Sequence, residues 1–194
     1  MALYAGIDCG TQGTKVVIVD SQQGAILGEG SAPHRIISDS NGRREQEADW
    51  WIEALIVAFH QAVAQAQVDP LEIQALGVSG QQHGFVPLDE QGNVLHNVKL
   101  WCDTETTEEN ALLLQQLGGV EGSLAKLGLM VATGYTASKI LWFKNHHPVQ
   151  WARLHTVLLP HDYLNFWLTG ERVAEYGDAS GTGLLNVRTR QWDK

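Results

Sequence analysis

The chain has 194 residues, which is enough for one substantial core or for one domain with a trailing element. With 44% hydrophobic and 18% charged residues, its composition is that of an ordinary globular protein. Its net charge is −9, and its 13 lysines and arginines are scattered along the sequence. This argues against binding to nucleic acid, which needs clustered cations. No apolar run approaches the roughly 20 residues of a membrane helix, and no signal peptide precedes the first strand pattern. We therefore expect a cytoplasmic protein without a membrane partner.

The first third of the chain predicts a meander followed by a helix. Residues 6–20 contain two apolar runs around a glycine-rich turn, typical of two strands in a hairpin, and residues 25–30 can add a third antiparallel strand. The polar segment 38–46 is expected to cross the surface as a loop. A helix capped by Asp49 follows. Its predicted apolar face consists of Ile52, Leu55, Ile56, Phe59 and Val63.

The remaining elements alternate strands with helices. Residues 73–79 have the pattern of a buried strand, and later strands are expected at residues 85–88 and 98–101. Thr106 and Glu109 have capping-box spacing at the start of a helix. Two more helices are expected, over residues 137–146 and 162–168. No repeat or linker interrupts the chain, so residues 1–194 are expected to form a single α/β domain.

The segment around Asp8 carries the clearest chemical signal. Asp8 ends the first strand, where a carboxylate can hold a hydrated Mg²⁺. The small residues that follow are expected to turn successive backbone N–H groups into one concavity that suits phosphate oxygens; they are Gly10, Thr11, Gln12 and Gly13. Walker A and GxGxxG motifs do not fit, because a strand follows where they require a helix. For this segment alone, an ordinary glycine-rich hairpin with one exposed aspartate is the alternative.

Two further polar motifs follow predicted strands. Gln82 and His83 lie in a loop closed by glycines, and Trp101 and Asp103 stand at the end of a later strand. Open sheets bind ligands at the carboxyl ends of their strands, so we expect these motifs and Asp8 to share one cleft. An indole face suits the C–H surface of a sugar, and histidine and aspartate can fix individual hydroxyls.

Six ordered segments resemble the FGGY carbohydrate kinases, and within them the xylulokinase branch. They are residues 6–15, 80–84, 100–103, 134–142, 158–163 and 178–182, so the resemblance covers essentially the whole chain. It implies a ribonuclease H-like, actin-like ATPase domain, with a mixed sheet that begins as an antiparallel meander and has helices on both faces. The implied reaction transfers the γ-phosphoryl group of ATP to the C5 hydroxyl of D-xylulose.

The resemblance also implies roles for single residues. Asp8 resembles the carboxylate that positions Mg²⁺ beside the phosphates, and residues 10–13 resemble the first phosphate loop. The residues implied at the sugar are Gln82, mainly through its backbone, His83 through its ring, and Trp101 and Asp103 as lining of the pocket. Lys139 and Trp142 belong to a family signature, for which packing or loop anchoring is expected rather than catalysis.

The departures from the family pattern set the limits of this interpretation. Family members are more than twice as long, and their general-base aspartate and adenine pocket belong to a C-terminal domain. The resemblance therefore implies an N-terminal domain that is inactive by itself and has that second domain as its partner; it also allows a homodimer. Cys102 stands where the family has asparagine, which leaves the exact sugar open, whereas glycerol is disfavoured because its kinases carry Arg-Glu in place of Gln82 and His83.

Two other classes of function remain open at this point. One is a stand-alone module that responds to a sugar or a nucleotide without catalysis. The other is an actin-like or chaperone-like ATPase, which shares the phosphate hairpin. Such an ATPase has no reason to carry the pairs Gln82-His83 and Trp101-Asp103.

Overall fold

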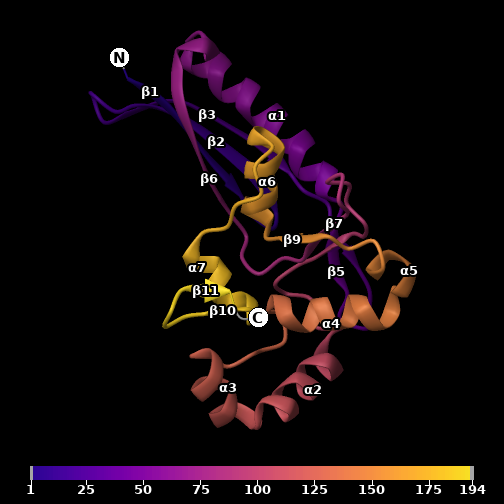
Figure 1. Cartoon of the computed structure of the whole chain (residues 1–194). Coiled ribbons are helices and arrows are strands. Elements are labelled where there is room, and N and C mark those ends of the chain that lie inside the picture. The colour runs from indigo at the N-terminus through magenta and orange to yellow at the C-terminus, as the bar shows by residue number, and fades with distance from the viewer. Residues whose placement is uncertain (1, 193–194) are drawn as a thin grey trace. The chain divides into compact units, whose positions relative to one another are not determined.

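The first three strands form the predicted antiparallel meander in a computed structural model that describes residues 2–192 (Figure 1). β1 (Leu3–Cys9) pairs with β2 (Gly13–Asp20), and β2 pairs with β3 (Ala25–Pro33). β6 (Ile73–Gly80) joins β1 in parallel, which gives the sheet order β3-β2-β1-β6. The expected α/β class, with a mixed sheet that opens as a meander, is confirmed.

The described residues separate into two compact units. The first consists of residues 2–35 and Glu47–Gln81, and the second of Ile36–Gln46 and residues 82–192. The first unit therefore contains the meander, β6, the long helix α1 (Ala48–Ala66) and the short 3₁₀ helix at Pro70–Glu72. Among residues 2–192, no helix combines the length and apolarity that crossing a membrane requires.

Helix α1 packs on β2 and β3, but with a different face from the predicted one. Its buried residues are Ala48, Trp51, Ala54, Leu55, Ala58 and Ala62. Of the predicted face only Leu55 is fully buried, whereas Ile56 is 42% exposed. The helix also begins two residues earlier than expected, with Glu47 rather than Asp49 at the N-cap position.

Glycines in β3 explain why the alanine-rich face of the helix packs on the sheet. A Cβ atom on Gly28 would lie 2.2 Å from the carbonyl oxygen of Ala62, and one on Gly30 would lie 2.0 Å from that of Ala58. Helix and strand backbones are thus in direct contact, which only glycine on one side and alanine on the other permit. Bulky side chains cannot enter this contact. Apart from Leu55, the residues of the predicted face are therefore half-buried or exposed.

Gly30→Ala is expected to destabilise the chain by about 1–3 kcal/mol, because the new methyl group overpacks a backbone contact. Gly77→Ala in β6 is the matched control, since within the described residues no atom lies within 4 Å of its added Cβ. Glycine in a strand is entropically unfavourable relative to alanine by roughly 0.5–1 kcal/mol, so the control is expected to be neutral or stabilising. Urea unfolding curves measure both changes, and equal midpoints for the two variants would contradict the close contact.

Strand β6 is not the buried strand that the sequence predicts. It is the edge strand of its sheet, and its residues are exposed or half-buried along the whole length. Leu76, for example, is 45% exposed. Among residues 2–192, the apolar side chains of this strand are therefore not buried.

The second unit is built from short strands and helices. β4 (Ile37–Ser38), β5 (Arg44–Gln46) and β8 (Val98–Lys99) form one small sheet, while β7 (Val86–Leu88) pairs with β9 (Thr156–Leu158) and β10 (Leu185–Asn186) with β11 (Gln191–Trp192). The helices are α2 (Thr107–Leu117), α3 (Gly119–Leu127), α4 (Thr136–His146), α5 (Pro148–Trp151), α6 (Pro160–Thr169) and α7 (Tyr176–Ala179), with a 3₁₀ turn at Ser180–Thr182. Phe85, Trp142 and Phe143 form its aromatic core.

Two expectations for this unit are wrong, one of them in part, and for the same reason. Segment 38–46 begins as a surface loop with residues 38–41 exposed, but its end is strand β5, in which Glu45 and Gln46 are fully buried. The capping box is also absent: the Thr106 hydroxyl lies 2.9 Å from Ser138 Oγ and makes no cap hydrogen bond. In both places polar side chains that suggest a surface or a helix end are used for buried hydrogen bonds inside the unit.

Candidate functional site

Asp8 lies where the sequence predicts, near the end of β1, and its side chain is exposed. In the sheet it is directly opposite Lys15 of β2 and Ser79 of β6. Opposite residues project from the same face of a sheet, so a carboxylate, an ammonium and a hydroxyl form one row. An exposed single carboxylate is the kind of protein ligand that Mg²⁺ uses when waters and phosphates complete its shell. The donor chemistry thus fits the metal, and sequence reasoning had assigned no role to Lys15.

The hydrogen bonding of the turn at residues 10–13 differs from the expectation. The N–H group of Gly10 donates to the carbonyl of Gly13 over 3.0 Å, so it closes the turn and does not point into a phosphate-binding concavity. Neither glycine has a positive φ. Gly13 is required instead by close packing, since its Cβ would lie 2.6 Å from the carbonyl oxygen of Ala32.

His34, which sequence reasoning missed, clamps this turn from the end of β3. Its Nδ1 lies 3.0 Å from the carbonyl oxygen of Gly10, and its Nε2 lies 2.9 Å from the hydroxyl of Thr14. Because a carbonyl can only accept, Nδ1 carries the proton and Nε2 accepts from Thr14. Burial lowers the pKa of His34 and outweighs the hydrogen bonds to Gly10 and Thr11. The clamp is therefore a neutral imidazole, which adds no charge to the turn.

In the second unit, the backbone of His83 adopts a left-handed conformation with φ 57°. Non-glycine residues hold this conformation only where their surroundings fix it. The ammonium of Lys139 donates to the His83 carbonyl oxygen over 2.7 Å, and the Thr136 hydroxyl lies 3.3 Å from the same oxygen. Lys139 also donates to the carbonyl of Gly134, and burial lowers its pKa to about 7. The family-signature lysine therefore anchors the loop, as predicted.

The ring of His83 is held by residues from two other segments. Its Nδ1 lies 2.7 Å from Oδ1 of Asp178, and its ring centroid lies 4.4 Å from that of Tyr135. A Cβ on Gly181 would come within 2.2 Å of the ring. Sequence reasoning placed Asp178 only in a structural motif, and its contact with His83, which lies 95 positions away, could not be predicted from local pattern.

The other side chains that are predicted to contact the sugar differ sharply in exposure. Gln82 is exposed and Trp101 is 45% exposed, so both can meet a ligand. Asp103, by contrast, is fully buried. Its carboxylate accepts the backbone N–H groups of Arg44 (2.8 Å) and Glu105 (3.0 Å). In this unit it supports the loop that begins at Trp101.

A buried ammonium stands at the centre of this region. The Nζ of Lys99 lies 3.1 Å from Glu45 and 3.3 Å from Asp103, contacts Glu105, and sits 3.8 Å from the ring centroid of Trp142. Burial lowers the pKa of Lys99, but the three carboxylates outweigh it and the net shift is upward. The cluster of acidic groups thus already has its cation.

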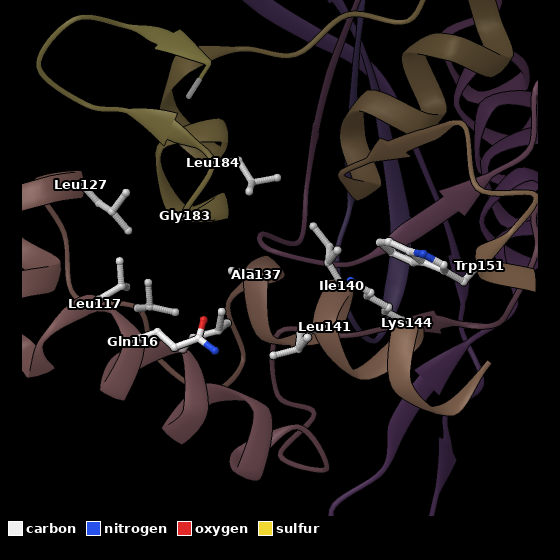
Figure 2. A pocket seen from close by; sticks show the side chains of 12 residues that line it. Gln116, Leu117, Leu127, Ala137, Ile140, Leu141, Lys144, Trp151, Gly183 and Leu184 are labelled. Carbon is white, nitrogen blue, oxygen red and sulfur yellow. The ribbon is translucent and has the colours of Figure 1, made fainter. Parts of the chain in front are cut away.

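An apolar pocket of about 460 Å³ opens elsewhere in the second unit (Figure 2). Leucine and isoleucine side chains of α2 and α4, with Leu127 and Leu184, point into it, and Lys144 and Gln116 are its polar members. None of the residues predicted to meet sugar or phosphate, all of which the structure describes, lines this pocket. Aliphatic walls cannot satisfy the hydroxyl groups of a sugar, so the candidate sugar site is the surroundings of His83.

The structure therefore gathers the predicted residues in two groups. Asp8 and residues 10–13 lie together in the first unit, and Gln82, His83, Trp101 and Asp103 belong to the second. That both groups face one cleft remains a prediction.

Known proteins resemble this chain over nearly its whole length. It is 50% identical to the xylulose kinase of Haemophilus influenzae over 196 residues, an alignment that covers 99% of this chain and 40% of that enzyme. The crystal structure of a xylulose kinase from Brucella ovis matches with a TM-score of 0.89 and 34% identity, over 98% of this chain and 39% of that one. A gluconate kinase from Lactobacillus acidophilus matches with a TM-score of 0.87 and 25% identity, over 99% and 38%.

These matches confirm the actin-like fold that the resemblance implied. The chain spans about two fifths of the length of the relatives it matches. The model of the FGGY carbohydrate kinases, N-terminal domain, matches residues 3–194. The chain therefore belongs to the FGGY family of carbohydrate kinases.

Proposed function

We propose that residues 1–194 form the N-terminal domain of a kinase that transfers the γ-phosphoryl group of ATP to the C5 hydroxyl of D-xylulose. FGGY kinases act on carbohydrates with ATP. The 50% identity to the Haemophilus influenzae xylulose kinase along the whole chain supports this choice of sugar over that of the gluconate kinase, which is 25% identical. The observation that carries the proposal is the fixed presentation of His83 next to exposed Gln82, with the half-exposed Trp101 in the same unit.

The second unit provides groups suited to a ketose. The His83 ring can hydrogen-bond a hydroxyl, the backbone at Gln82 can do the same, and the indole of Trp101 offers an apolar face to C–H groups. The carboxylate of Asp103 is buried, so in this proposal it does not contact the sugar directly. Asp103 shapes the sugar pocket by holding the loop that begins at Trp101.

The first unit provides groups suited to phosphate. Asp8 would hold Mg²⁺ through its water shell, and the turn at residues 10–13 would lie along the phosphates, with Lys15 in the same row as Asp8. When bound, Mg²⁺ neutralises charge on the transferred phosphoryl group, and positioning and charge are most of what this reaction needs. The general base is assigned to a C-terminal domain, so we expect this chain alone to bind sugar weakly and to turn over no ATP.

Calorimetric titration of the 194-residue chain with D-xylulose tests the sugar half of the proposal. His83→Ala is expected to weaken binding at least about tenfold, the equivalent of one good hydrogen bond of roughly 1.4 kcal/mol. His155→Ala is the matched control, because His155 is exposed and contacts Thr156. Equal affinities of the wild type and His83→Ala would reject His83 as the sugar ligand.

A further inference from the structure

We propose that two glutamines of α1, Gln61 and Gln65, cover the free edge of β3 and so prevent a second copy of this chain from pairing with it. β3 is an end strand of its sheet, and within residues 2–192 it pairs only with β2. The outer edge of such a strand can bond any other extended chain unless something blocks it. This role belongs to the first unit alone and is independent of the kinase activity.

Each glutamine accepts one outward N–H group of the strand. Oε1 of Gln65 accepts the backbone N–H of Glu29 over 2.9 Å, and Oε1 of Gln61 accepts that of Ser31, also over 2.9 Å. In an antiparallel pair, alternate residues direct their backbone groups toward the partner strand or away from it. Glu29 and Ser31 are two positions apart, so both face away from β2. The N–H groups that a new strand would bond are therefore already satisfied by side chains.

The dimensions of helix and strand allow two glutamines to serve two amides. Gln61 and Gln65 are one helical turn apart, a rise of about 6 Å along the axis, and alternate residues of a strand are about 7 Å apart. The backbone contacts of Gly28 and Gly30 bring α1 directly onto β3. From a helix this close, a glutamine side chain reaches past the strand to its outer edge.

The ends of this edge are closed by other means. Pro33 is the next outward residue after Ser31, and proline has no N–H group to donate. Toward the other end, the register with β2 shifts between Ile18 and Val19, which leaves Leu27 as a bulge. Proline and bulges are both devices that keep natural edge strands from pairing. The two glutamines thus cover the regular stretch between the bulge and the proline.

Amide hydrogen exchange of the 194-residue chain, followed by NMR in dilute solution, measures the two hydrogen bonds. The amides of Glu29 and Ser31 are expected to exchange about tenfold faster in Gln61→Ala/Gln65→Ala than in the wild type, the factor of one lost hydrogen bond. Alanine favours a helix, so α1 is expected to stay folded. In Gln61→Glu/Gln65→Glu the carboxylates still accept, and slow exchange is expected to remain. Unprotected amides in the wild type would overturn the proposal whether or not the variants fold.

Sedimentation velocity over a range of protein concentrations, at one fixed ionic strength, tests the consequence for pairing. The alanine variant is expected to dimerise at a concentration about tenfold lower than the wild type. In that dimer the amides of Glu29 and Ser31 are expected to be protected again, because a strand of the second copy accepts them. Gln115→Ala/Gln116→Ala, at two exposed positions of α2, is the control and is expected to match the wild type. An alanine variant that dimerises no more readily than the wild type would refute the role of the glutamines, and so would a dimer in which both amides stay unprotected.

Discussion

Asp8→Asn is expected to reduce phosphoryl transfer by roughly 10³-fold or more once this chain is joined to the C-terminal domain of a relative such as the Haemophilus influenzae xylulose kinase. A metal ion contributes several kcal/mol to such a reaction, and about 4 kcal/mol corresponds to this factor in rate. Asparagine keeps the shape of the side chain but lacks the charge that holds a hard cation. The measurement is kcat at saturating D-xylulose and ATP, at several magnesium concentrations.

Two comparisons make this experiment specific. Asp8 is exposed, so the variant is expected to unfold at the wild-type urea concentration and to bind D-xylulose with unchanged affinity, the opposite of His83→Ala. Glu29→Gln, at an exposed position of the same sheet, is expected to keep full activity. Wild-type kcat in Asp8→Asn would remove this carboxylate from the metal site.

Lys99→Met is expected to destabilise the chain by about 3–5 kcal/mol at neutral pH, because it removes the cation that two buried carboxylates share. Lys99 is fully buried, and so are Glu45 and Asp103, two of the three carboxylates that it contacts. Methionine replaces the apolar stem, so the loss reports the missing charge rather than a cavity. Lys126→Met, at an exposed position near the end of α3, is the control and is expected to change stability by less than about 0.5 kcal/mol.

The pH dependence of this loss has a definite sign. In the wild type, burial raises the pKa of Glu45, but Arg43 and Lys99 outweigh burial and the net shift is downward. Glu45 therefore adds stability above its unfolded pKa of about 4.5 and loses it as the pH falls. Without Lys99 its folded pKa rises, so the penalty of the variant is full at neutral pH and shrinks as the pH falls and the carboxyl group takes up a proton. A loss that does not change from pH 7 down to about pH 4, below the unfolded pKa of Glu45, within the precision of urea unfolding, would contradict this account.

The parts of the fold that could be predicted are those whose signal is local. The meander was predictable because apolar strands alternate with glycine turns. The helix ends at Gly118 and Gly170 were predictable because glycine readily takes the positive φ that both residues have in the structure. The buried face of α1 was not predictable from hydrophobicity, since glycines of β3 decide it from outside the helix. Segment 38–46 appeared to be a loop because the partner of Glu45 is Lys99, more than 50 positions away.

The candidate site divides in the same way. Asp8 and His83 could be proposed from the sequence because each stands in a short polar motif after a strand. His34 and Asp178 could not, because a single histidine or aspartate in a polar segment gives no sign of the distant group it will contact. Exposure was beyond the sequence as well: Trp101 and Asp103 are two positions apart, yet one is half exposed and the other fully buried.

The open side of β6 affects how the isolated chain can be handled. Within residues 2–192, this strand has a pairing partner only in β1, so a row of backbone donors and acceptors remains where a second copy could add a strand. The net charge of −9 opposes such association, and salt weakens the repulsion. Concentrated samples in high salt are therefore the ones most prone to self-association, and dilute samples at low ionic strength favour the monomer.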